Sequence, residues 1–302
     1  MAKIIIGNQL YYVPEIKKSS HGSSLKNSIT VVYFTIILAV IYGLTSCQKV
    51  ISIDLNSAST QLVVEANISD QPGPYYVKLS KTVNFSDITE IPAVTGAIVE
   101  ISDSSGNEET LTELKNGIYQ ASTLKGIPGH KYTLTIKTEG QTYRSVSEMP
   151  YPVGNLNLEL KSVIEYEHSF GGSSSDQSLH YVVNFGINDP EEYKNYYRFL
   201  VYHKNREISS RRVFDDQFHN GKLIEDEFIL RDTVDFNQGD TIKIELQNID
   251  EGTYNFFRTL REGAGGMSFL SASPSNPISN ISNDGLGYFN ACSVIKRFLI
   301  IH

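Results

Sequence analysis

The sequence predicts a mainly β fold with two β-sandwich-like domains and one short helix near the C-terminus. Three observations support this. Short apolar segments rich in β-branched residues recur after residue 60, without the spacing of an amphipathic helix. Turn signals containing glycine, proline or asparagine separate them. Only one segment after residue 60 has convincing helical spacing. A chain of 302 residues has room for one large or two medium domains.

The first group of strands fills residues 61–148, which we expect to form an N-terminal β-sandwich. Residues 62–68 are apolar and β-branched, and a Gln-Pro-Gly-Pro turn follows them. Asn116-Gly117 is a strong signal for a tight hairpin. The predicted strands cover residues 62–68, 75–80, 97–102, 110–114, 118–121, 131–137 and 142–146.

Two prolines, Pro150 and Pro152, resist sheet pairing, so we place a boundary there and a C-terminal β-rich domain at residues 154–302. The helix is expected over residues 250–262, where Asp250 can cap the first turn. Asp215-Asp216 and the acids at 225–227 are expected to flank a hairpin. The predicted strands of this domain cover residues 156–166, 181–187, 196–203, 228–232, 241–246 and 287–301.

An uncharged, almost continuously apolar segment precedes the strands and ends in Leu44-Thr45-Ser46-Cys47. Basic residues before such a segment, and small residues directly before a cysteine, are typical of a bacterial lipoprotein signal. We therefore expect residues 1–46 to be a signal peptide that is cleaved between Ser46 and Cys47, with Cys47 acylated. Residues 47–60 would be a tether, and two or three acyl chains, palmitate among them, would hold the protein on a membrane. The alternative is a plain transmembrane anchor, for which about 16–20 apolar residues are few.

The lead before this apolar segment is long for a lipoprotein signal. Leu25 followed by Lys26 would begin a compact signal. We therefore expect that residues 1–24 are not translated in the cell, which the intact mass of the unprocessed precursor would test.

The charge of the expected mature chain is strongly acidic. Residues 47–302 hold 22 basic and 33 acidic residues, a net charge of −11. Such a surface repels phosphate backbones, so nucleic-acid binding is not expected. After lipidation Cys292 would be the remaining thiol, and we expect it to be buried without a reactive role.

Motifs that carry chemistry are scarce. The sequence has no Gly-x-Ser-x-Gly elbow, His-Glu-x-x-His motif, EF-hand loop or phosphate loop, and its histidines lack metal-ligand spacing. We expect no cofactor, no metal and no catalytic residues. Three interpretations of the acidic clusters at 189–192 and 215–227 stay open: calcium binding, glycoside cleavage, and a solvated surface without either function. The tyrosines at 193–202 fit cross-strand packing or a recognition surface.

Several segments together resemble the Bacteroidota lipoprotein family called domain of unknown function 4249. The resemblance spans nearly all of the expected mature chain and implies no activity and no catalytic residues. It implies a cell-envelope lipoprotein, often associated with TonB-dependent outer-membrane receptors, whose first half is similar to the immunoglobulin-like or transthyretin-like sandwiches of carboxypeptidase regulatory domains. The segments are Cys47 with Ile53-Asp54-Leu55, Leu62-Val63-Val64-Glu65-Ala66, Gly117-Ile118-Tyr119, Pro128-Gly129, Tyr132-Thr133-Leu134, Gly239-Asp240, Glu245-Leu246, Ile249-Asp250, Tyr254, Asn276-Pro277, Asn280-Ile281 and Gly285-Leu286-Gly287-Tyr288-Phe289.

The expected function is therefore that of a non-enzymatic binding or accessory subunit, lipid-anchored in the bacterial outer membrane and working with a TonB-dependent uptake system. Residues 48–53 contain no acid, so the periplasmic face and the cell surface stay equally open. The loop at residues 263–284 is the candidate partner-contacting element, because such loops carry function on rigid scaffolds. The candidate binding residues in and after this loop are Asn276, Pro277, Asn280, Gly287, Tyr288 and Phe289.

Two alternatives stay open. One is an envelope hydrolase for glycans or peptides that uses dispersed carboxylates such as Asp189 and Glu192. The other is a structural or adhesion module, which a tyrosine-rich sheet without a pocket would suit.

Overall fold

The computed structural model describes residues 2–6, 9–13, 60–83, 90–168, 175–230, 236–264 and 276–302. The chain forms two compact units, Met1–Asn56 and Ser57–His302. In the first unit, β1 (Ala2–Ile6) pairs antiparallel with β2 (Gln9–Val13). The expected signal cleavage site at Ser46, the lipidation site at Cys47 and the tether up to residue 59 lie outside the described residues.

The second unit is mainly β, as the sequence predicts. Its described residues form a sheet of eight strands in the order β14-β13-β16-β17-β3-β4-β8-β7, called the large sheet below. A sheet of four (β10-β9-β5-β6) and a sheet of three (β11-β12-β15) accompany it. The strands are β3 (Leu62–Ser69), β4 (Tyr75–Lys81), β5 (Ile98–Asp103), β6 (Glu108–Thr110), β7 (Thr112–Lys115), β8 (Ile118–Ala121), β9 (Lys131–Thr138), β10 (Gln141–Glu148), β11 (Leu156–His168), β12 (Ser175–Asn188), β13 (Tyr196–His203), β14 (Arg206–Asp215), β15 (Leu223–Leu230), β16 (Thr241–Ile249) and β17 (Leu286–Ile300).

One core fills the N-terminal half, between the four-stranded sheet and the β3, β4 and β8 end of the large sheet. Alternate residues of β3 point into it, with Val64, Ala66 and Ile68 buried. Tyr132 and Leu134 of β9 enter the same core from the other sheet. The period-2 alternation that predicts these strands therefore also selects the residues that form the sandwich.

A second core fills the C-terminal half, where the three-stranded sheet packs on β13 and β16. Phe185 of β12 and Phe199 of β13 meet with ring centroids 4.6 Å apart. Ile242, Ile244 and Leu246 of β16 complete the contact. Both halves are thus sandwich-like, each with its own core.

Strand β17 joins the two halves. Residues 286–292 pair in parallel with β3, and residues 293–300 pair antiparallel with β16. Gly287 makes the close approach possible, because it has φ +97° and an added Cβ would lie 1.9 Å from the Val64 carbonyl oxygen. The boundary expected at residues 149–153 does not separate the two cores along the chain, because the first core also contains Phe289 and Ala291 of β17, and the large sheet is continuous across both halves. Whether the halves fold as separate domains stays a prediction.

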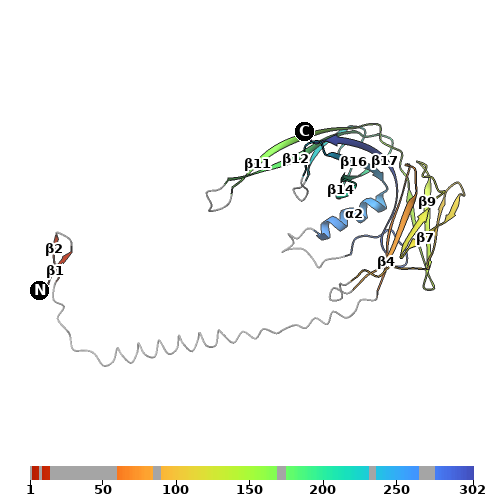
Figure 1. The fold of residues 1–302 in the computed structure, drawn as a ribbon, viewed down its shortest axis with the longest axis horizontal. Coiled ribbons are helices and arrows are strands. Elements are labelled where there is room, and N and C mark those ends of the chain that lie inside the picture. The colour runs from red at the N-terminus through yellow and green to blue at the C-terminus, as the bar shows by residue number, and fades with distance from the viewer. Residues whose placement is uncertain are drawn as a thin grey trace, which may run out of the picture. The chain divides into compact units, whose positions relative to one another are not determined.

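The single helix of the described residues, α2 (Glu251–Ala264), covers one face of the large sheet (Figure 1). Asp250 caps it as predicted, accepting a hydrogen bond of 2.8 Å from the Thr253 amide. Among the residues described, no helix has the length and apolarity needed to cross a membrane.

Two segments differ from the predicted strands. Residues 110–114 are not one strand, because Leu111 turns into the core and the chain passes from β6 in one sheet to β7 in another. The expected hairpin across residues 216–225 is also wrong. β14 pairs with β13, whereas β15 pairs with β12 in a different sheet.

Candidate functional site

The face of the large sheet that α2 covers, called the helix-side face below, combines an apolar cluster, which includes Phe257 of α2 and Val294 of β17, with buried polar side chains. In β16 the residues facing the second core are Ile242, Ile244 and Leu246. Because strand side chains alternate, Glu245 and Gln247 point to the opposite face, yet both are buried. A buried polar side chain is costly unless it is hydrogen-bonded, so these residues need partners on that face.

Three amide side chains on this face form a hydrogen-bonded row, called the amide row below. Asn67 of β3 lies opposite Asn290 of β17 in the parallel register. The Asn290 Nδ2 donates to Asn67 Oδ1 at 3.2 Å and to Gln247 Oε1 at 3.5 Å. The row therefore connects strands from both halves of the protein.

The helix and the strands beside it hold the ends of the amide row. Arg198 Nη1 donates to Gln247 Oε1 at 3.3 Å, and its guanidinium lies 3.7 Å from the ring centroid of Phe257 in α2. At the other end, Asn67 Nδ2 donates to the Tyr288 hydroxyl at 3.2 Å. The Tyr288 ring in turn packs on Phe257 with centroids 4.8 Å apart. These contacts fix the side-chain directions of the row.

The anchoring of α2 also ties it to both halves. Ser147 of β10 donates to Asp250 Oδ2 at 2.6 Å and accepts from the Ala291 amide at 2.8 Å. Thr253 Oγ1 donates to the Phe289 carbonyl at 3.3 Å. The helix position is thus set by polar contacts to β10 and β17.

Two pairs of opposite charges lie beside the amide row. Lys243 Nζ is 2.8 Å from Glu245 Oε1 and 3.8 Å from the ring centroid of Tyr202. On β3 and β4, Lys78 Nζ is 2.9 Å from Glu65 Oε1. Glu245 and Glu65 are therefore each paired with a lysine.

A cavity of about 260 Å³ opens beside the row, next to the turn that joins β3 and β4. Its wall includes two members of the amide row, Asn67 and Gln247, together with Glu245. Tyr76, opposite Asn67 in the register, supplies a ring that is 47% exposed. The cavity thus combines hydrogen-bonding side chains with an accessible aromatic face, the usual composition of a ligand site.

Burial changes the pKa of one thiol and two phenols on this face. Burial raises the pKa of the Cys292 thiol, which lines the cavity, to about 12. Burial also raises the pKa of the Tyr288 and Tyr202 phenols. These three groups stay protonated at neutral pH, and of the three Cys292 lines the cavity.

Some of the sequence-predicted binding residues lie on the helix-side face, and others support the packing and pairing of the strands. Tyr288 belongs to the helix-side face, through its contact with Asn67. Phe289 is fully buried in the first core, and Gly287 touches the β3 backbone. Asn276 is exposed and Pro277 is half-buried in the loop.

Asn280 acts as a substitute strand partner for β17. Its Nδ2 donates to the Phe289 carbonyl at 2.8 Å, and its Oδ1 accepts from the Phe289 amide at 2.9 Å. Nearby, Ser282 bonds to the Arg144 backbone on β10 through its amide at 2.8 Å and its hydroxyl at 2.7 Å. Residues 276–284, the described end of the loop, therefore stabilise the positions of β17 and β10. Residues 265–275 lie outside the described residues.

The carboxylates of the hydrolase alternative do not form a pair around an open site. Asp189 is buried, and it accepts hydrogen bonds from the Tyr197 hydroxyl and from the Gly221 amide at 3.0 Å. Burial raises its pKa, outweighing the hydrogen bond from Tyr197. Glu192 is exposed. Asp189 thus stabilises the junction between two loops.

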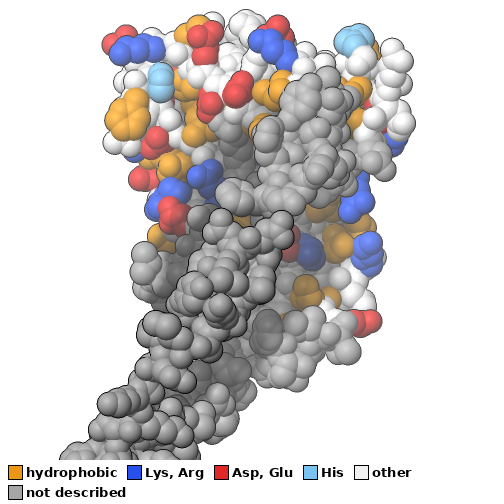
Figure 2. Space-filling model, turned by 90° about the vertical axis from the view of Figure 1, so that its left-hand side faces the viewer, with side chains coloured by type: hydrophobic (Ala, Val, Ile, Leu, Met, Phe, Trp, Pro, Cys, Tyr) orange, Lys and Arg blue, Asp and Glu red, His pale blue; other side chains and the backbone are white. Residues whose placement is uncertain are grey.

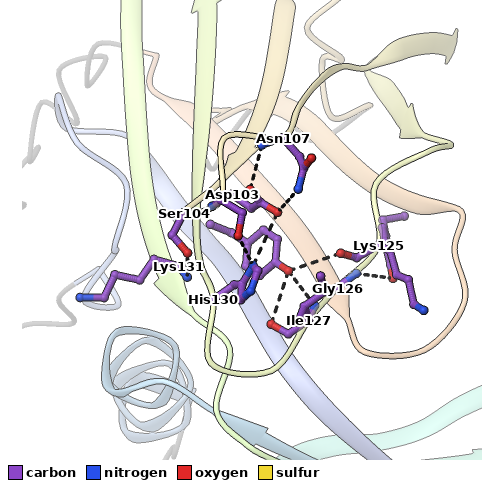
Figure 3. A network of polar contacts seen from close by, with 11 residues as sticks. Asp103, Ser104, Asn107, Lys125, Gly126, Ile127, His130 and Lys131 are labelled. Atoms are coloured by element: carbon purple, nitrogen blue, oxygen red, sulfur yellow. Dashed lines mark hydrogen bonds and ion pairs between the residues drawn. The ribbon is translucent and has the colours of Figure 1, made fainter.

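A second polar cluster surrounds Asp103 in the N-terminal half (Figure 3). The Asp103 carboxylate accepts from the Asn107 amide and side chain at 2.9 and 2.8 Å. Burial opposes its charge, but the hydrogen bonds from Asn107 and Ser105 outweigh this and lower the pKa of Asp103. Ser105 Oγ and Asp103 approach the same nitrogen of His130, Nδ1, at 3.5 and 3.6 Å. In a serine–histidine–aspartate relay, the serine and the aspartate bond opposite nitrogens of the histidine ring. Here both approach one nitrogen, so we interpret the cluster as stabilising the turn.

In the acidic cluster at residues 215–227, Glu225, Asp226 and Glu227 lie on β15, whereas Asp215 ends β14. A shallow cavity of about 510 Å³ lies over β11, β12 and β15, with Glu159, Asn184 and Glu225 in its wall. Within the described ranges, no group of three or more histidine, cysteine, aspartate or glutamate side chains has the arrangement of a metal site. The calcium alternative gains no support from these residues.

Sequence reasoning found Tyr288 but not the amide row or Arg198. The available signal was the alternation in 242–247, where apolar residues face one side and Lys243, Glu245 and Gln247 face the other. Asn67 and Asn290 lie in strands that are mostly apolar, far apart in the chain, and only the sheet register brings them together.

Fold and site define a class of protein: a mainly β protein with a small, polar, preformed cavity where its two halves share a sheet. A family model described as domain of unknown function (DUF4249) matches residues 48–297. The chain belongs to this family, which confirms the resemblance found in the sequence. No curated protein matches the chain.

Proposed function

We propose that this protein is a lipid-anchored lipoprotein of the bacterial outer membrane that binds a small ligand in the helix-side cavity, without catalysis, as an accessory subunit of a TonB-dependent uptake system. The observation that carries the binding role is the cavity beside the amide row. Its side chains are fixed by contacts to four strands and to α2, so little conformational entropy is lost when a ligand binds.

The chemistry of the cavity supports binding over turnover. The amides of Asn67 and Gln247 do not titrate, and the nearby thiol and phenols keep their protons at neutral pH. Glu245, which could act as a base, is paired with Lys243. Groups of this kind recognise a ligand by hydrogen bonds and have no means of moving a proton at pH 7.

The acidic charge of the chain supports a partner or ligand other than nucleic acid. Figure 2 shows lysine, arginine and acidic side chains interspersed over the face in view, without a continuous basic patch. The net charge of the whole chain is −8. A basic patch is the expected footprint of nucleic-acid binding.

The proposed anchor supplies the link to uptake. Acylation of Cys47 would confine the binding body near an outer-membrane channel and raise the effective concentration of captured ligand there, without tight intrinsic binding. A bacterial envelope is also where a lipoprotein signal directs a chain.

The anchor and the partner can be tested in the same cells. Labelled palmitate should be incorporated into the wild-type chain, and Cys47→Ala should abolish the label and release the protein from the membrane fraction. Extraction of native membranes in mild detergent should then recover a TonB-dependent receptor with the wild-type protein. A chain that takes up no palmitate, or a Cys47→Ala variant that stays membrane-bound, would contradict the proposal.

A further inference from the structure

We propose that the helix-side cavity binds an uncharged polyhydroxyl ring, such as one neutral sugar unit. This rests on the proposed binding function and names its ligand class. The proposal follows from three features of the cavity: its compensated charges, its amide row and its exposed tyrosine ring.

The compensated charges disfavour an ionic ligand. Glu245 is held at 2.8 Å by Lys243, and Glu65 at 2.9 Å by Lys78. The guanidinium of Arg198 lies on the Phe257 ring and bonds Gln247. A cationic ligand would have to compete with Lys243 for the buried Glu245 and would leave one charge there without compensation, which is costly. Lys296, the other charged residue of the cavity wall, is exposed to solvent, where pairing with an anion gains little. A neutral ligand avoids the cost at Glu245.

The amide row favours a ligand with several hydroxyl groups. Each side-chain amide has both donors and an acceptor, and a hydroxyl is likewise donor and acceptor. Asn67 and Gln247 line the cavity, and Asn290 lies between them and bonds both. The Oδ1 of Asn290 is fully buried and has no hydrogen-bond partner among the described residues. Asn290 itself is fully buried and is not part of the cavity wall, so the two lining amides, those of Asn67 and Gln247, are the groups that ligand hydroxyls would bond.

The Tyr76 ring favours a ligand with an apolar face. It lies directly across the strand pair from Asn67 and is 47% exposed. A sugar ring has hydroxyls around its edge and C–H groups on its faces, so it can bond the amides while one face packs on the tyrosine. The volume agrees, because about 260 Å³ lies just below the range of about 300–1,000 Å³ for drug-sized ligands.

Saturation-transfer NMR on the full chain in mild detergent tests this inference. The probes are glucose, galactose, mannose and N-acetylglucosamine, with glucuronate and galacturonate as anionic counterparts and glycine as a zwitterionic one. Disaccharides of the same sugars distinguish a free sugar from the end of a glycan. We expect at least one neutral probe to saturate with a Kd of about 1–10 mM, the weak end of specific binding.

Matched tyrosine variants locate the site. Tyr76→Ala should weaken binding of that probe at least about tenfold, because it removes the stacking face. Tyr76→Phe keeps the ring and should bind like the parent, and so should Tyr193→Ala, which removes a comparably exposed tyrosine outside the cavity.

Three results would overturn the inference. If only glucuronate, galacturonate or glycine binds and Tyr76→Ala weakens it, the ligand class is wrong while the binding function stands. If a neutral sugar binds Tyr76→Ala as well as the parent, the site is wrong. If no probe binds at roughly ten times the expected Kd, the inference fails, and the palmitate and receptor experiments still decide the proposed function separately.

Discussion

Gly287 is the residue on which the junction between the two halves depends most directly. A Cβ at this position would lie 1.9 Å from the Val64 carbonyl oxygen, so β17 could not pair with β3. We expect Gly287→Ala to lower stability by roughly 3–5 kcal/mol, at the severe end for a point substitution. The midpoint of thermal unfolding measures this.

Gly140 is a matched control for Gly287. It also has a positive φ, +74°, but nothing lies within 4 Å of an added Cβ. Gly140→Ala should therefore cost only the backbone strain, about 1–2 kcal/mol. Equal losses for the two variants would show that the close contact with Val64 is not the reason for glycine at residue 287.

Asp250 predicts a dependence of stability on pH. Burial raises its pKa in the folded protein, outweighing the hydrogen bonds from Ser147 and Thr253. An acid with a raised folded pKa stabilises the fold while protonated, and this stability is lost as pH rises from the unfolded pKa through the folded pKa. Asn is also a good N-cap but does not titrate. The advantage of Asp250→Asn over the parent in thermal unfolding should therefore grow from pH 4 to pH 7.

Comparison of Asp250→Ala with Asp250→Asn separates the cap from the charge. Asp250→Ala removes both the hydrogen bond to the Thr253 amide and the titration, so we expect a loss of about 1 kcal/mol from the cap. If the difference between Asp250→Asn and the parent does not change with pH, the carboxyl titrates alike in the folded and unfolded chains and the interpretation is wrong.

At the scale of elements, the end of the loop at residues 276–284 serves as an edge for β17. Asn280→Ala would leave both the amide and the carbonyl of the buried Phe289 without their amide partner, and we expect a loss of roughly 2–4 kcal/mol. Denaturant unfolding measures it. Asn276→Ala, at an exposed position in the same loop, should unfold like the parent.

This role changes how partner contact at the loop can be tested. Deleting residues 263–284 would remove the Asn280 and Ser282 contacts and disturb the fold itself. Substitution of Asn276 leaves these contacts in place. A stable Asn276→Ala variant that no longer recovers the receptor would place the partner at this loop, and unchanged recovery would remove Asn276 from the candidate contacts.

Strands with a clear period-2 pattern could be predicted from the sequence. Residues 131–137 become β9, because one row of their side chains enters a core. Residues 196–203 become β13, which is buried on both faces. β14 was not predictable in this way, since charged and serine side chains dominate Arg206–Asp215. It forms by backbone pairing with the apolar strand β13, and a composition rule does not detect such pairing.

The site could be predicted only in part for a related reason. Tyr288 could be named as a candidate from the sequence because it lies in one of the segments that carry the family resemblance. Asn67, Gln247 and Asn290 come from three strands, and two of these, β3 and β17, pair in parallel although far apart in the chain. The register that brings them together is set by long-range packing, and local sequence patterns carry no information about it.

At the scale of the whole molecule, the shared sheet bears on the predicted domain boundary. The first core contains Phe289 and Ala291 from β17 as well as residues 62–149. We expect residues 57–148 expressed alone to be unfolded or aggregated, because β3 would have an unpaired edge and the core would lack these side chains. Amide dispersion in NMR spectra tests this. A dispersed spectrum would show that the N-terminal sandwich folds independently.

The position of β3 has a mechanical consequence. It is the first strand after the proposed tether, and it is hydrogen-bonded to β17 on one side and to β4 on the other. Tension from a membrane anchor would act along β3 and load both ladders in shear, so that many hydrogen bonds resist at once instead of opening one after another. The attachment point would thus be the part of the body best able to withstand pulling while a bound cargo or partner moves.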